Sequence, residues 1–186
     1  MSSAAIEVMS VEVQRPALYR RILAPIDGSE LSQEAVPHAV KLAAATGASV
    51  AFLTVLEPFH ILSTSAEMLE ATREEYERHA EAQGDQILEK AAETARALGV
   101  ACVTVRRWGE QPYRDIIDVA KELDCDLIAM ASHGRGGVSS LVLGSVSNKV
   151  LAHSSVPVLV LRKPHPEAIR QFEKLAEAGY VGAGIA

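Results

Sequence analysis

Short runs of aliphatic residues alternate with segments of helical periodicity along this chain, and that alternation constrains the fold more than any other feature. Runs that are apolar throughout are typical of strands buried on both faces, and helical crossovers usually connect parallel strands. The sequence therefore predicts an α/β protein with an open five-stranded parallel sheet and helices on both faces. The expected strands are 22–26, 49–56, 100–106, 126–131 and 157–162, and the expected helices are 29–46, 67–98, 111–123 and 145–152.

The length of 186 residues favours a single domain that can bury its own core. We expect a polar leader over residues 1–19, a folded domain over residues 20–162 and a C-terminal helical extension over residues 163–186, with its helix at 167–178. The first expected helix starts at Ser29 or Ser32, and Pro37 inside it is predicted either to kink the helix or to mark a late start.

Composition and charge exclude several classes of function. A net charge of −6 without a basic stripe argues against nucleic-acid binding. No apolar run approaches the ~20 residues that span a membrane, and the first 19 residues do not resemble a secretory signal. Cys102 and Cys125 have no metal-binding or redox spacing, so we expect two buried thiols in a reducing compartment. The sequence predicts a cytoplasmic protein without a metal site.

The loop from Ala131 to Ser145 is rich in glycine and serine and connects an expected strand to an expected helix. Glycines let backbone amides approach a ligand, and a helix N-terminus offers unpaired N–H groups and a positive dipole end. The Walker pattern is absent, because no lysine lies between Gly144 and Ser145, and Ser139 replaces the third glycine of the dinucleotide pattern. The loop indicates a phosphate site, with an ordinary loop and helix cap as the alternative.

Asp27 follows the first expected strand, and the glycine loop follows the fourth. Ligands of open parallel sheets lie beyond the carboxyl ends of the strands, where the direction of the connections reverses. If these two strands are neighbours, a carboxylate that suits ribose hydroxyls faces a loop that suits phosphates. The alternative for Asp27 is a turn or helix-cap residue.

Together these motifs resemble the ATP-binding branch of the universal stress protein family. Its loop pattern G-x2-G-x9-G-[S/T] is matched by Gly134, Gly144 and Ser145, whereas Ala131 replaces the first glycine. The resemblance covers residues 20–162 and includes the segments 22–29, 53–55 and 155–160. It implies a Rossmann-like fold, of the adenine nucleotide alpha-hydrolase type, with strand order 3-2-1-4-5.

The resemblance also implies a role for each part of the site. Pro25, Ile26 and Val55 would surround the adenine, and Asp27 would bind the ribose. The floor between base and sugar would be Met130, Ala131 and Ser132, and the phosphates would be held by Gly134, Arg135, Gly144, Ser145, Val146 and Ser147. The implied ligand is ATP with Mg²⁺ held largely by the triphosphate, although AMP or a cyclic nucleotide could use the same base and ribose contacts.

Two further loop residues have open interpretations. His133 is a candidate general base, but packing or hydrogen bonding is favoured because no carboxylate lies near it in sequence. Arg135 suits phosphate oxygens, and the alternative is a solvated arginine. No catalytic residue is assigned.

Three classes of function follow from these observations. The favoured class is a nucleotide-dependent stress regulator that acts through a protein partner or its dimer state. The others are a nucleotide-using enzyme, at most a slow ATP hydrolase, and a dimer that shares the fold without binding nucleotide. The family resemblance implies a homodimer through the last strand, Pro157 to Arg162, whose apolar edge also needs a cover on physical grounds.

Overall fold

The computed structural model describes residues 18–58, 66–134, 143–162, 170 and 174. Nearly all of the expected leader and C-terminal extension, and residues 59–65 of the loop after the second strand, lie outside them. The strands are β1 (Arg21–Pro25), β2 (Ser49–Leu56), β3 (Cys102–Trp108), β4 (Leu127–Ala131) and β5 (Val158–Leu161), and the helices are α1 (Glu30–Thr46), α2 (Ala66–Ala97), α3 (Pro112–Glu122) and α4 (Ser145–His153).

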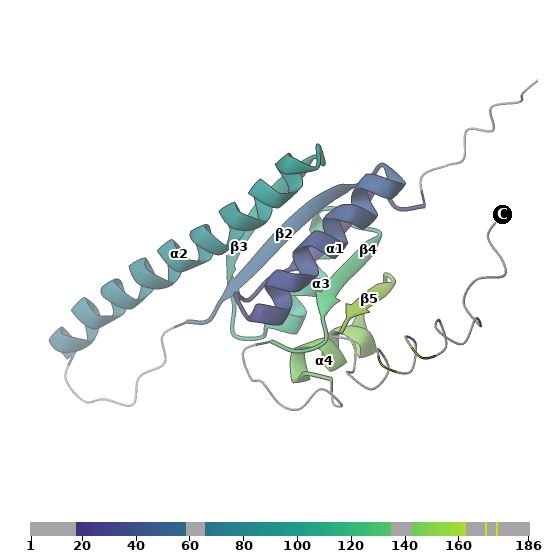
Figure 1. Ribbon diagram of the computed structural model, residues 1–186. Helices are drawn as coiled ribbons and strands as arrows, with labels where there is room; N and C mark the ends of the chain where they lie inside the picture. Colours follow the sequence, from purple (N-terminus) through teal and green to yellow (C-terminus); the bar gives the residue numbers. More distant parts are fainter. Residues whose placement is uncertain (1–17, 59–65, 135–142, 163–169, 171–173, 175–186) are drawn as a thin grey trace, which may run out of the picture.

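The five strands form one parallel sheet in the order β3-β2-β1-β4-β5, as expected (Figure 1). Strands β2 and β3 follow one another on one side of β1. The chain then crosses to the other side of β1, where β4 and β5 follow. Because β1 and β4 are neighbours, their carboxyl ends meet at one edge of the sheet. That meeting point is where open α/β sheets bind ligands.

The two faces of the sheet carry two separate apolar cores. In β1, Ile22 and Ala24 belong to the core that α1 and α2 cover, whereas Leu23 belongs to the core that α3 and α4 cover. This division follows from the two-residue period of side chains along a strand. All three of these side chains are at most 3% exposed. The continuous apolar runs in the sequence are therefore explained by helices on both faces.

Most element boundaries differ from the sequence prediction by one or two residues, and two of these differences have a clear local cause. Helix α1 begins at Glu30 and continues through Pro37, so the predicted late start is wrong. Its N-cap is Ser29, whose side chain accepts a hydrogen bond from the amide of Ser32. Strand β3 begins at Cys102, two residues later than expected, because the amide of Val100 still bonds to a carbonyl of the preceding helix turn.

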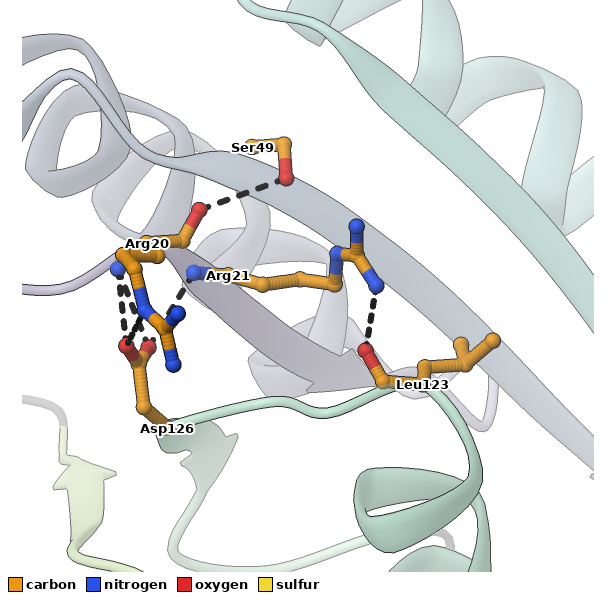
Figure 2. Close-up of polar contacts among 5 residues, drawn as sticks. All are labelled: Arg20, Arg21, Ser49, Leu123 and Asp126. Carbon is orange, nitrogen blue, oxygen red and sulfur yellow. Dashed lines mark hydrogen bonds and ion pairs between the residues drawn. The ribbon is translucent and has the colours of Figure 1, made fainter.

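A carboxylate fixes the amino ends of β1 and β4, at the edge of the sheet opposite the expected site (Figure 2). Asp126 accepts hydrogen bonds from the backbone amides of Arg20, at 2.9 and 3.1 Å, and Arg21, at 3.1 Å. The Arg20 guanidinium lies 3.5 Å from the same carboxylate, and the Arg21 guanidinium donates to the Leu123 carbonyl. Partial burial raises the pKa of Asp126, but these donors outweigh it and hold the pKa below its usual value.

We predict that Asp126→Asn destabilises the domain by about 1 kcal/mol, because in either orientation the amide NH₂ group would face N–H donors. A lowered folded-state pKa contributes stability above the ordinary Asp pKa of about 4, and this contribution is lost as the pH falls through the folded-state pKa. Urea unfolding of both proteins should therefore show a difference at pH 7 that shrinks below about pH 4. A difference that is constant with pH would contradict this role.

Candidate functional site

The expected site lies where the sheet opens between β1 and β4. The β1–β2 register continues to the pair Pro25–Leu53, but the β1–β4 register ends at Leu23–Ile128. The amide of Ile26 bonds to the carbonyl of Leu53 on β2 at 2.8 Å. Successive residues of a strand direct their backbone polar groups to opposite neighbours, so those of residue 25 are directed toward β4. Proline has no N–H to donate there. Pro25 thus helps to separate the ends of the two strands.

A cavity of about 480 Å³ occupies this opening. Its volume falls within the range of small-molecule sites in proteins, roughly 300–1,000 Å³. The walls come from the ends of β1, β2 and β4 and from the first turns of α1, α3 and α4. The lining residues are Pro25, Ile26, Asp27, Ser32, Leu53, Val55, Glu57, Pro112, Ile116, Met130, Ala131, His133, Gly134, Leu143, Gly144, Ser145, Val146 and Ser147.

Asp27 serves both as a turn residue and as a wall of the cavity. Its Oδ1 accepts hydrogen bonds from the amide of Ser29 at 3.0 Å and from the Ser29 hydroxyl at 2.7 Å. Its other oxygen, Oδ2, lies against Gly134, where a Cβ atom would come within 2.3 Å of it. The strand-end carboxylate and the glycine loop are therefore in direct contact, and Gly134 leaves the space that this oxygen occupies.

The N-terminus of α4 also forms part of the cavity wall. Gly144 is the N-cap and has no side chain that could accept hydrogen bonds from the first turn. The first intrahelical bond runs from the amide of Asn148 to the carbonyl of Gly144, so the amides of Ser145, Val146 and Ser147 have no intrahelical acceptor. These N–H groups and the positive end of the helix dipole suit an anion.

Backbone hydrogen bonds hold the ends of this loop together. The amide of Gly144 donates to the carbonyl of Ser132 at 2.8 Å, and the hydroxyl of Ser147 donates to the carbonyl of Ala131 at 3.0 Å. Ser147 is 3% exposed, so this second bond is buried. A side chain at Gly144 would place its Cβ 3.3 Å from both the Ser132 carbonyl oxygen and the His133 Cα. The start of α4 is therefore fixed directly against the end of β4.

Ala131, which replaces the first glycine of the family pattern, has an ordinary strand conformation. It is the last residue of β4, and Asp124 is the non-glycine residue with positive φ in the described part of the chain. The backbone at this position therefore does not require glycine.

Most of the predicted site residues lie together around the cavity. Of the remaining two, Ser132 is 1% exposed and lies behind the lining, where its hydroxyl is 2.9 Å from His133 Nδ1, and Arg135 lies outside the described residues. His133 does line the cavity, and its Nε2 is buried with no hydrogen-bond partner among the residues that the structure describes. The sequence analysis missed Ser32, Leu53, Glu57, Pro112, Ile116 and Leu143 as lining residues.

Some of these residues carried a sequence signal and others did not. Glu57 follows an expected strand just as Asp27 does, and Ser32 lies in the first turn of the helix after Asp27. Pro112 and Ile116 belong to α3, which reaches the cavity only because α3 packs on the same face of the sheet as α4. Nothing in the local sequence of α3 indicates this contact.

The acidic side chains of the cavity lining favour a ligand group that is uncharged or donates hydrogen bonds. Asp27 and Glu57 are acidic, and the lining residues that the structure describes include no lysine or arginine. An anionic ligand would therefore depend on the α4 amides and on a counter-ion. Within the described residues, no three His, Cys, Asp or Glu side chains are grouped as metal ligands, and no helix has the length and apolar character needed to cross a membrane.

The fold and the cavity define this chain as an open-sheet α/β protein with a ligand pocket at the reversal of strand order. Residues 18–162 match the model of the universal stress protein family. The chain is 34% identical over 149 residues to the universal stress protein YxiE of Bacillus subtilis, which covers 78% of this chain and all of YxiE. The chain belongs to the universal stress protein family.

Solved structures agree with this assignment. The structure of the protein MJ0577 of Methanocaldococcus jannaschii superposes with a TM-score of 0.69 at 25% identity, over 80% of this chain and 99% of MJ0577. A universal stress protein crystallised in complex with cAMP superposes with a TM-score of 0.58 at 25% identity, over 77% of this chain and 97% of that protein.

We predict that Gly144→Ala lowers the free energy of unfolding by about 1 kcal/mol, because alanine is a poor N-cap and its Cβ would press on backbone atoms that cannot rotate away. Gly144→Ser separates the two causes, since serine caps well but carries the same Cβ. In urea unfolding, neither variant should exceed the wild type in stability. A more stable Gly144→Ser protein would show that the contact with residues 132 and 133 does not matter.

Proposed function

We propose that this chain binds ATP in the cavity between β1 and β4 and acts as a nucleotide-dependent regulator in a stress response. The observation that carries the proposal is that the contact between Asp27 and Gly134 and the start of α4, which has no side-chain cap, line the same cavity. A carboxylate suits ribose hydroxyls, and unpaired helix amides suit phosphates.

The remaining lining suits an adenine base. Pro25, Ile26, Val55 and Met130 contribute apolar surface, as binding of a flat aromatic ring requires. In the same scheme Ala131 forms the floor with Ser132 behind it, and the phosphates are held by Gly134, Arg135, Gly144, Ser145, Val146 and Ser147. Because Asp27 and Glu57 add negative charge, Mg²⁺ would accompany the triphosphate and be held mainly by it. The universal stress protein crystallised with cAMP supports an adenine nucleotide as the ligand class.

A Gly134→Ala variant tests the site. Its Cβ would displace the Asp27 carboxylate, which is the end of a side chain that can move, so we expect ATP affinity to fall at least tenfold while the urea midpoint changes little. The measurement is calorimetric titration of ATP and Mg²⁺ into protein freed of nucleotide, where the wild type should bind one ATP per chain.

The control is Gly84→Ala on α2, whose Cβ would meet the Leu56 side chain away from the cavity lining. It should bind ATP like the wild type. Absence of any heat with the wild type, together with no nucleotide in the purified protein, would contradict ATP binding and leave a protein that shares only the fold.

We also propose that the chain forms a homodimer through β5 in the cytoplasm, and that nucleotide binding is communicated to a protein partner or through this dimer. Residues Val158–Leu161 form a wholly aliphatic edge strand, with Leu159 39% exposed. The other edge, β3, carries Arg106 and Arg107, which pair with acidic side chains of α2 and α3. Charged edges resist pairing, so β5 is the favoured interface.

We predict that light scattering at micromolar concentration gives the mass of a dimer for the wild type and of a monomer for Leu159→Lys. The matched control is Val103→Lys, because Val103 is 53% exposed on the opposite edge strand. This control should remain dimeric. A monomeric wild type, or dissociation by Val103→Lys instead of Leu159→Lys, would contradict an interface through β5.

A further inference from the structure

We propose that Ser29 is a positioning residue that sets which oxygen of Asp27 faces the ligand, and so determines how strongly the site recognises ribose hydroxyls. This inference rests on the proposed nucleotide-binding function. Ser29 is not among the residues that line the cavity, but it bonds to two that are, Asp27 and Ser32, so it reaches the ligand through them.

The hydrogen bonds of Ser29 fix the Asp27 carboxylate in one orientation. Both bonds from Ser29, the amide at 3.0 Å and the hydroxyl at 2.7 Å, reach the same oxygen, Oδ1. A carboxylate oxygen has two lone-pair sites, so these two donors satisfy Oδ1. Ser29 therefore holds Oδ1 on its own side, and Oδ2 lies toward Gly134 at the wall of the cavity.

The same hydroxyl connects the site to helix α1. The Ser29 Oγ donates to Asp27 and accepts from the amide of Ser32 at 3.2 Å, as the N-cap of α1. A hydroxyl can donate once and accept at the same time, so serine fills both roles together. Glycine at this position would keep most of the N-cap stability but lose the donor to Asp27.

A merely structural serine and a positioning serine differ in one respect. If Ser29 only caps α1, its removal weakens all ligands of the cavity equally. If Ser29 orients Asp27 toward the sugar, its removal weakens only ligands that carry ribose hydroxyls. The loss should then disappear with a nucleotide that has neither hydroxyl, because Oδ2 has no sugar donor to accept.

The experiment is calorimetric titration of ATP and 2′,3′-dideoxy-ATP, each with Mg²⁺, into the wild type, Ser29→Gly and Ser29→Thr. We expect Ser29→Gly to bind ATP at least about tenfold more weakly, as the loss of one hydrogen bond to a charged group implies. Its affinity for dideoxy-ATP should stay within about twofold of the wild type. Ser29→Thr keeps the hydroxyl and should restore ATP affinity.

Thr46→Ala is the matched control, since it removes a hydroxyl that bonds to the Leu42 carbonyl at the other end of α1. It should bind both nucleotides like the wild type, and urea unfolding verifies that each variant is folded. Equal weakening of ATP and dideoxy-ATP by Ser29→Gly, or no weakening of either, would overturn the role of Ser29 and leave ATP binding intact. A wild type that binds neither nucleotide would overturn both proposals.

Discussion

The separation of β1 from β4 at their carboxyl ends is the feature on which the rest of the site depends. β1 is the central strand of the sheet and is hydrogen-bonded on both sides at its start, where Asp126 binds the amides of Arg20 and Arg21. At its other end, Pro25 cannot donate toward β4, and only the pairing with β2 continues. The sheet is closed at one end and open at the other, so the cavity forms at the open end.

Polar groups surround this opening, and each has a defined structural origin. Asp27 accepts two hydrogen bonds from Ser29, the first amides of α4 have no side-chain cap because Gly144 is the N-cap, and Gly134 leaves room for the Asp27 carboxylate. Two of these features rely on the absence of a side chain. Glycine at position 144 stabilises the start of α4 less than a serine or aspartate N-cap would, but it leaves the N–H groups of the first turn directed at the cavity. The buried Nε2 of His133, which has no partner among the described residues, is a further group whose hydrogen bonding is incomplete there.

The proposed signalling role is consistent with how the cavity is built. Its walls include the first turns of α1, α3 and α4, and α4 packs against β5, the strand proposed to form the dimer. A ligand that contacts the start of α4 therefore touches an element next to the proposed interface. A difference in affinity between two arrangements of α4 would be enough to connect ligand binding to the dimer or a partner.

The sequence by itself determined the α/β class, the expected strands and the glycine loop. The periodicity of apolar residues and the spacing of glycines are local properties that can be read without knowledge of tertiary contacts. The strand order and most of the residues now found around the cavity followed from the family resemblance. Only the tertiary structure decided that Asp27 touches Gly134, that α3 supplies Pro112 and Ile116, and that β3 starts at Cys102. The contacts join residues far apart in the chain, and the start of β3 depends on how the preceding helix ends. A local sequence pattern contains no information about either.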